Sequence, residues 1–169
     1  METKFKAPKG QTTKIMTLLT LLLCVVAVIK LVLQIVNTNR FPIGILVVVV
    51  IVVLVIVMSY LLSPAGYVLS DNELIINQPV RSKKIRYKEI LGVRHIQKEE
   101  LRGMIRTFGI GGLFGQVGKF YHKNFGTMNL FVSQLKNLVL IETANKKYLI
   151  SPDTIDFLEK IKGKIPYKK

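Results

Sequence analysis

Two long apolar runs dominate the first third of the chain, at residues 15–36 and 43–62, and a short polar break at residues 37–42 separates them. At a helical rise of about 1.5 Å per residue, runs of this length reach roughly 30 Å, the thickness of a bilayer core. The pattern therefore predicts two membrane-spanning helices joined by a short turn, which together form a transmembrane helical hairpin over residues 15–62.

The composition of the second run requires a choice between helix and strand. Val47 to Val57 is almost entirely β-branched, which in water is typical of a buried strand. Buried strands extend over only about 4–8 residues, however, and a segment in lipid must satisfy its own backbone hydrogen bonds. We therefore expect a helix. The first run is also longer than the apolar core of about 7–15 residues found in a secretory signal.

Basic residues flank the two runs unevenly. Residues 1–14 hold four lysines against one glutamate, and Lys and Arg are frequent after residue 62, whereas the break contains only Arg40. Cytoplasmic flanks of membrane spans are enriched in Lys and Arg. We therefore expect residues 1–14 to be a basic cytoplasmic tail and both termini to be cytoplasmic. The protein would be a multi-pass protein of the cell membrane with two spans.

One charged residue interrupts the first run. Lys30 lies near its outer end, and Gln34 follows one helical turn later on the same face. A lysine in this position can extend its amine to the membrane interface, which is the interpretation we favour. The alternative is that Lys30 and Gln34 join the chain to other subunits of a membrane oligomer or a pore-associated assembly.

Residues 63–169 are enough for one small domain with its own core, and most of its predicted elements are strands. In residues 84–88, Ile85 and Tyr87 alternate with three cations, so the two apolar side chains are expected to face a core. Further strands are predicted at residues 67–69, 74–76, 90–96, 128–133, 138–143 and 147–150, with the last two forming a hairpin.

A helix is predicted at the end of the domain. Ser151 is a suitable N-cap, and Pro152 suits the first helical position. Ile155, Leu158 and Ile161 are spaced to form a buried stripe. Gly163 is expected to end the helix.

Short strands followed by one C-terminal helix occur in this order in the pleckstrin-homology (PH) fold. The chain resembles more closely the bacterial PH-like domains that follow one or two membrane spans. This resemblance rests on three passages: YVLSDNEL, FGIGGLFGQVGKFY, and NLVLI running into YLISP. The resemblance covers about residues 64–163. It implies a transmembrane helical hairpin followed by a mainly-β, partly open barrel capped by a C-terminal α-helix, in a bacterial inner membrane.

The formal net charge of +15 raises the question of an anionic partner. Five cations gather in one predicted hairpin: Arg81, Lys83, Lys84, Arg86 and Lys88. An anionic leaflet attracts each juxtamembrane cation by about 1 kcal/mol. In PH domains a basic hairpin often holds phosphorylated headgroups, so the resemblance implies that these five residues bind lipid. The alternative is a solvated face that merely obeys the positive-inside rule.

Glycine and aromatic residues alternate through the second of these passages. Its apolar side chains are candidates for a membrane or partner loop, and they are Phe108, Leu113, Phe114, Phe120 and Tyr121. They either pack onto the barrel or enter the membrane interface, where aromatic rings are enriched. The glycine spacing departs from G-x-G-x-x-G and no βαβ unit surrounds it, so we expect no nucleotide site.

Signals for catalysis are missing from the sequence. Neither His95 nor His122 has a metal-ligand partner at helical spacing, and there is no G-x-S-x-G motif. We therefore expect no enzyme, no cofactor, no metal and no nucleic acid. The expected function is a membrane-anchored PH-like binding or scaffold module at the inner leaflet. Its expected partners are the lipid bilayer, including anionic phospholipid, and a protein partner or a second copy of the chain.

Overall fold

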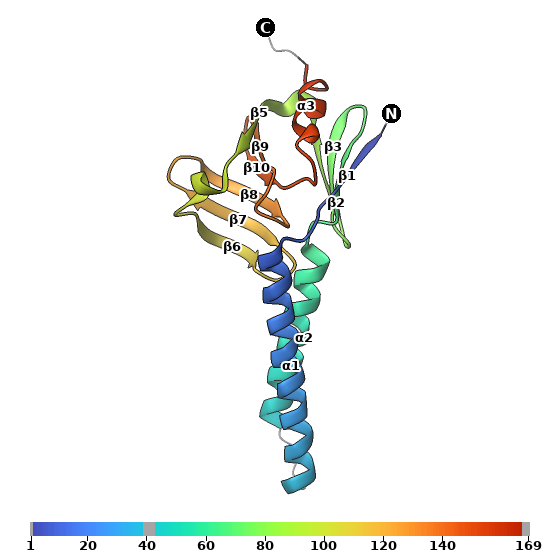
Figure 1. Cartoon of the computed structure of the whole chain (residues 1–169), viewed down its shortest axis with the longest axis vertical. Helices are drawn as coiled ribbons and strands as arrows, with labels where there is room; N and C mark the ends of the chain where they lie inside the picture. Colours follow the sequence, from blue (N-terminus) through green and yellow to red (C-terminus); the bar gives the residue numbers. More distant parts are fainter. Residues whose placement is uncertain (1, 39–42, 167–169) are drawn as a thin grey trace.

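A computed structural model describes residues 2–38 and 43–166. Two long helices, α1 (Gln11–Thr38) and α2 (Ile43–Leu62), leave a mostly-β domain on the same side (Figure 1). Both helices are long and apolar enough to cross a membrane. They contain the two predicted runs. Residues 39–42, which make up most of the predicted turn and include Arg40, lie outside the described residues, as do Lys168 and Lys169 of the basic C-terminal end.

Helix α1 begins four residues before its apolar run because its first turn is fastened to the domain. The backbone N–H of Gly10 donates to the carbonyl oxygen of Ser133 at 3.0 Å. The hydroxyl of Thr13 donates to the same oxygen at 3.3 Å. The polar residues ahead of the apolar run therefore belong to the helix and anchor it.

The segment expected to be a tail contributes a strand. β1 (Thr3–Lys6) pairs antiparallel with β2 (Gly66–Leu69), with Lys6 opposite Gly66. Phe5 is buried, and its ring meets that of Phe157 edge-on at a centroid distance of 5.0 Å. The sequence contains little signal for this strand, because β1 has one apolar side chain and both helices separate it in the chain from its partner strand.

The first sheet has the order β1-β2-β3-β4, with β3 (Glu73–Asn77) and β4 (Ser82–Arg86), and all of its pairs are antiparallel. Ile85 and Tyr87 are buried, while Lys84, Arg86 and Lys88 are exposed, so the predicted alternation is confirmed. A short 3-10 helix, η1 (Tyr87–Glu89), carries the chain from this sheet into the second one.

The second sheet has the order β5-β9-β10-β8-β7-β6. Its strands are β5 (Ile90–Ile96), β6 (Ile105–Gly111), β7 (Gln116–His122), β8 (Gly126–Val132), β9 (Leu138–Thr143) and β10 (Lys147–Ile150), and η2 (Lys98–Leu101) lies between β5 and β6. Strands β5, β9 and β10 have the predicted bounds. Among the strands of the described residues, β8 and β10 are the one pair that runs parallel. The two sheets do not close on each other, which confirms the mainly-β, partly open arrangement.

Strands β6 and β7 were not predicted, because glycine is a poor strand former and hides the alternation. They form a hairpin in which Gly109 lies opposite Gly118. A Cβ atom on Gly118 would lie 2.2 Å from the carbonyl oxygen of Phe108. The two backbones therefore approach at a distance that only glycine permits.

The C-terminal helix starts later than predicted. α3 spans Asp156–Lys162, so Ser151 is not its cap. The Ser151 hydroxyl instead accepts hydrogen bonds from the backbone N–H groups of Ser133 and Gln134, at 2.9 and 3.3 Å. These donors belong to the segment after β8, which the sequence does not place beside Ser151.

Helix α3 covers the open side between the sheets. It buries Phe157 and Ile161, whereas Ile155, expected to be buried, is exposed. Phe157 lies in the core between the sheets, edge-on to both Phe5 and Tyr67. The helix ends at Gly163 as predicted.

Candidate functional site

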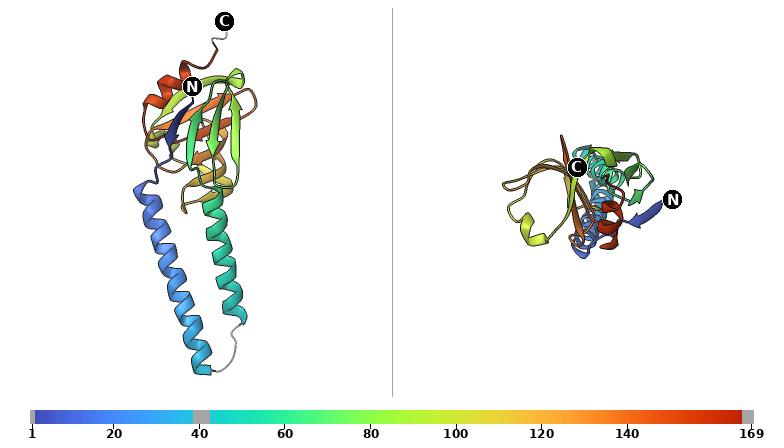
Figure 2. Two further views of the ribbon diagram at one scale, coloured as in Figure 1. Left: turned by 90° about the vertical axis from the view of Figure 1, so that its right-hand side faces the viewer. Right: turned by 90° about the horizontal axis from the view of Figure 1, so that it is seen from above.

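Helices α1 and α2 depart from one side of the domain, and we call this side the helix-proximal end (Figure 2, left). Two loops of the domain lie there. Gln78, in the β3–β4 turn, donates from Nε2 to the carbonyl oxygen of Leu62 at the end of α2. Phe114, in the β6–β7 turn, donates its backbone N–H to the hydroxyl of Thr17 on α1 at 3.4 Å.

The five candidate lipid-binding cations do not form one patch. Strand β4 starts at the helix-proximal end, where Ser82 lies opposite Asn77, and runs away from the helices to Arg86 opposite Glu73. At about 3.3 Å per residue, these four steps separate the two ends of β4 by roughly 13 Å. Arg81 and Lys83 therefore lie at the helix-proximal end, and Arg86 and Lys88 lie at the opposite end. All five cations are exposed.

Two of these cations have partners in β3 or in the turn that follows it. Lys84 forms a cross-strand ion pair with Glu73 at 2.9 Å. The Arg81 Nε donates to Gln78 Oε1 at 3.2 Å, and Gln78 in turn donates to the end of α2. The Arg81 guanidinium is therefore held next to the helix, while Lys84 is partly neutralised by its carboxylate neighbour.

The five residues of the candidate membrane or partner loop occupy three different environments. Phe114 packs against the helices, with its ring 5.5 Å from that of Tyr60 and the Lys9 amine 4.6 Å from its centroid. Leu113 lies half-buried in the same turn, and Phe120 is buried in the domain core. Phe108 and Tyr121 are exposed on the outside of the sheet.

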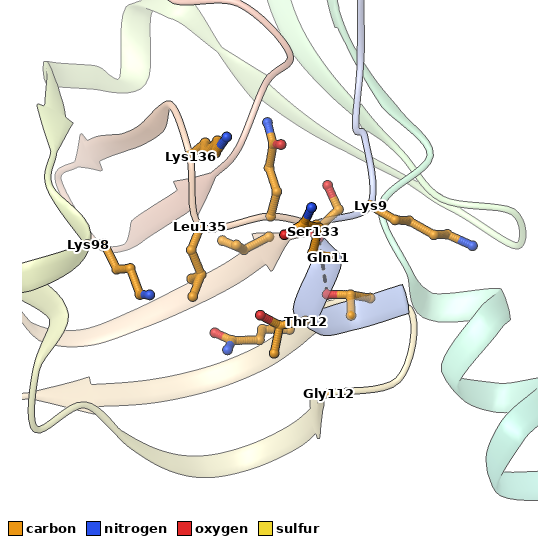
Figure 3. A pocket seen from close by; sticks show the side chains of 13 residues that line it. Lys9, Gln11, Thr12, Lys98, Gly112, Ser133, Leu135 and Lys136 are labelled. Atoms are coloured by element: carbon orange, nitrogen blue, oxygen red, sulfur yellow. Dashed lines mark hydrogen bonds between the residues drawn. The ribbon is translucent and has the colours of Figure 1, made fainter. Parts of the chain in front are cut away.

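A cavity of about 490 Å³ opens beside the first turn of α1, and sequence reasoning did not find it. Its cationic lining residues are Lys9, Lys98 and Lys136, and no aspartate or glutamate of the described residues lines it. In Figure 3, Lys98 extends toward Leu135, whereas Lys9 points out of the cavity toward α2. These residues come from three segments far apart in the chain, so no local sequence motif predicts the cavity.

The two histidines have structural surroundings. His122 is buried, its Nε2 lies 2.8 Å from the carbonyl oxygen of Arg102, and its ring stacks on Phe125. His95 is half-buried, with Nδ1 3.5 Å from the amide nitrogen of Gln97. Within residues 2–38 and 43–166, no three His, Cys, Asp or Glu side chains gather in a way that could hold a metal ion.

Two sheets that do not close, capped by α3 and preceded by two candidate membrane spans, define a PH-like domain protein with possible membrane helices. A family profile described as Bacterial PH domain matches residues 65–165. The chain therefore belongs to the bacterial PH domain family. The matched region contains every strand except β1, which the N-terminal segment adds to the domain.

Comparison with whole proteins adds little beyond the family. An uncharacterized protein of Clostridium acetobutylicum is 33% identical over 87 residues, a region that covers 49% of this chain and 29% of the relative. The chain thus matches less than a third of that protein's length. The search of solved structures found no match.

Proposed function

We propose that this protein is a membrane-anchored, non-enzymatic binding and scaffold module. Helices α1 and α2 span a bacterial inner membrane with both termini cytoplasmic, and the PH-like domain contacts anionic lipid of the inner leaflet. One observation carries the proposal. The end of the domain at which α1 begins and α2 ends is also the end that presents Lys9, Arg81, Lys83 and the lysine-lined cavity.

The energetics of such a contact are favourable for a tethered domain. Each Lys or Arg near an anionic surface contributes about 1 kcal/mol. Two spans keep the domain beside the leaflet, so binding costs little additional motional freedom. A few weak ionic contacts are therefore enough to hold the domain against the membrane, and the rest of its surface stays available to a protein partner.

The test needs a domain without its spans that still keeps β1. A fragment that starts at residue 64 would lose β1 and uncover Phe157. Because Lys6 and Gly66 are paired neighbours, a linker of about four residues from Ala7 to Ala65 closes an ordinary hairpin in place of residues 8–64. We call this form the spanless domain. We expect it to co-sediment with liposomes that contain anionic lipid, and to be released as the salt concentration rises. Absence of binding at low salt would contradict lipid contact.

Charge reversal at the two ends of β4 tests the orientation. The double variant Arg81→Glu/Lys83→Glu should weaken binding of the spanless domain to anionic liposomes by at least about 30-fold. Two lost attractions of about 1 kcal/mol each correspond to that factor, and repulsion of the two new carboxylates by the anionic surface adds to it. The variant Arg86→Glu/Lys88→Glu changes the net charge equally at the far end, and we expect less than about threefold weakening. Equal losses in the two variants would show that the helix-proximal end does not face the lipid.

A second candidate function, a subunit of a membrane oligomer or a pore-associated assembly, is favoured by the exposure of the helices. The most apolar windows of α1 and α2 are 0% and 6% buried within the chain, and Lys30 is exposed on α1. If Lys30 and Gln34 join copies, Lys30→Leu should shift an oligomer of the full chain to a smaller species in native mass spectrometry, while Ile29→Leu should not. A wild-type chain that is monomeric in the same detergent would exclude this candidate.

A further inference from the structure

The outer side of β6 and β7 carries large apolar side chains that the domain leaves exposed. Ile105 is 63% exposed, Phe108 is 75% exposed and Tyr121 is 46% exposed. We call these three residues the β6 rim. The same hairpin buries Phe120 on its other side, so the core-facing side of the hairpin is the one with Phe120 and not the one with the rim.

A β-bulge gathers the rim on one face. Ile105 lies opposite Tyr121, and the register then shifts between Arg106 and Phe108, so that Phe108 lies opposite Lys119. Lys119 and Tyr121 are two residues apart on β7 and share a face. Without the extra residue, Phe108 would point to the other side of the sheet from Ile105. The bulge therefore re-aims Phe108 to join the other two side chains.

The rim lies near the level at which the helices become apolar. Strand β6 is one of the two edge strands of the second sheet, and it is the strand of that sheet nearest to the departing helices (Figure 1). The turn that ends β6 touches Thr17, which is inside the apolar part of α1, and Tyr60, which lies within one turn of the end of α2. A membrane that holds both helices would reach this turn.

The charge around the rim fits a lipid surface. From Leu101 to Ile141 the chain has no Asp or Glu, and it has five cations: Arg102, Arg106, Lys119, Lys123 and Lys136. Arg106 and Lys119 lie on β6 and β7 themselves and are exposed. Apolar side chains bordered by cations suit the boundary between acyl chains and anionic headgroups.

We infer that the β6 rim lies in the headgroup and upper acyl region of the leaflet that α1 and α2 enter, with Phe108 inserted most deeply. This inference rests on the proposed function and adds a second attachment of the domain to the membrane. Together with Arg81 in the β3–β4 turn and Lys83 near the start of β4, the rim prevents the domain from tilting about its helices, so the helix-distal end keeps facing the cytoplasm.

The chain contains no tryptophan, so a single introduced tryptophan reports on its own surroundings. The full chain carrying Phe108→Trp is placed in nanodiscs of anionic phospholipid whose acyl chains are brominated near the headgroup, and its fluorescence is compared with that in unbrominated nanodiscs. We expect bromine quenching and an emission maximum blue-shifted from that of an exposed tryptophan. Tyr121→Trp, on the same face, provides a second reporter and should also be quenched.

Tryptophan at two further positions distinguishes a failure of the rim inference from a failure of the proposed function. Val50→Trp lies midway along α2, and acyl chains brominated near their middle should quench it if the helix spans the bilayer. Leu91→Trp is exposed on β5 at the helix-distal end and should remain unquenched with either lipid. If Val50→Trp is quenched while Phe108→Trp and Tyr121→Trp behave like Leu91→Trp, the rim inference is wrong and the anchor stands. If Val50→Trp is not quenched, the proposed function itself fails.

Discussion

Gly118→Ala should cause the largest loss of stability of any single substitution considered for the domain. A Cβ atom at this position would lie 2.2 Å from the carbonyl oxygen of Phe108 and 2.7 Å from the Cα atom of Gly109. Both are backbone atoms and cannot rotate away, and Gly118 has a φ of +138°, where a side chain is strained in any surroundings. Backbone strain of this kind costs about 1–3 kcal/mol, and separating the strands adds to that cost. We expect a loss of about 4 kcal/mol or more in the free energy of unfolding, against about 5–15 kcal/mol for a typical domain.

Urea denaturation of the spanless domain, followed by circular dichroism, measures this loss. Gly92→Ala on β5 is the matched control, because the nearest atom to its new Cβ is a side-chain oxygen of Glu142 at 3.9 Å, an ordinary contact distance. We expect Gly92→Ala to stay within about 0.5 kcal/mol of the parent domain. If the free energy of unfolding of Gly118→Ala lies within about 1 kcal/mol of that of the parent domain, a loss similar to that of the control, then the hairpin can open to admit a side chain.

Tyr67→Phe should cause the second largest loss. Tyr67 is fully buried, and its hydroxyl donates to the carbonyl oxygen of Phe131 at 2.7 Å and accepts from the backbone N–H of Ser151 at 3.1 Å. Removing the hydroxyl leaves two buried backbone groups without this partner, which costs about 2–3 kcal/mol. The same denaturation experiment measures the change. Tyr121→Phe, at an exposed tyrosine, should shift the free energy of unfolding by less than about 0.5 kcal/mol.

The pH dependence of the stability of the parent domain and of Tyr67→Phe provides an independent test of the burial of the Tyr67 hydroxyl. Burial raises the pKa of Tyr67 from 10.0 to about 12. In the unfolded chain the phenol loses its proton near pH 10, whereas in the folded domain it keeps the proton until about pH 12. The folded state therefore binds more protons between these values, and its stability falls as the pH rises, by about 1.4 kcal/mol per pH unit.

Tyr67→Phe lacks this titration, so the stability gap between the variant and the parent should narrow as the pH rises from 10 to 12. Lysine titration affects both proteins equally and cancels in the difference. A gap that stays constant across that range would mean that the Tyr67 hydroxyl is not buried as described.

The two helices could be predicted from the sequence alone, on the basis of the two apolar runs. Helix length follows from local composition, and a segment that satisfies its own backbone hydrogen bonds needs no distant partner. Local sequence also predicted the alternation at Ile85 and Tyr87, since a strand with one buried face repeats every two residues. It predicted the bounds of β5, β9 and β10 as short apolar runs, which need no alternation when both faces are largely buried, as in β9 and β10. The PH-like order of elements was therefore predictable.

The candidate site was only partly predictable. The sequence identified Arg81 and Lys83 as cations of a hairpin, but not that β4 carries Arg86 and Lys88 away from the helices. It identified Phe108 as a candidate contact, but not that a bulge aligns its side chain with Ile105. The cavity lysines Lys98 and Lys136 had no signal, because they come together only when η2 and the β8–β9 loop pack beside α1.

Tertiary structure alone decided the features that depend on contacts between distant segments. β1 forms because it pairs with the edge of β2, although both helices separate these two strands in the chain. The β6–β7 hairpin forms because two glycines permit a close backbone approach. Ser151 bonds to the segment after β8 instead of capping α3 because the parallel pairing of β10 with β8 places it there. Local periodicity determines which elements form, whereas the packing of segments far apart in the chain determines which side chains meet.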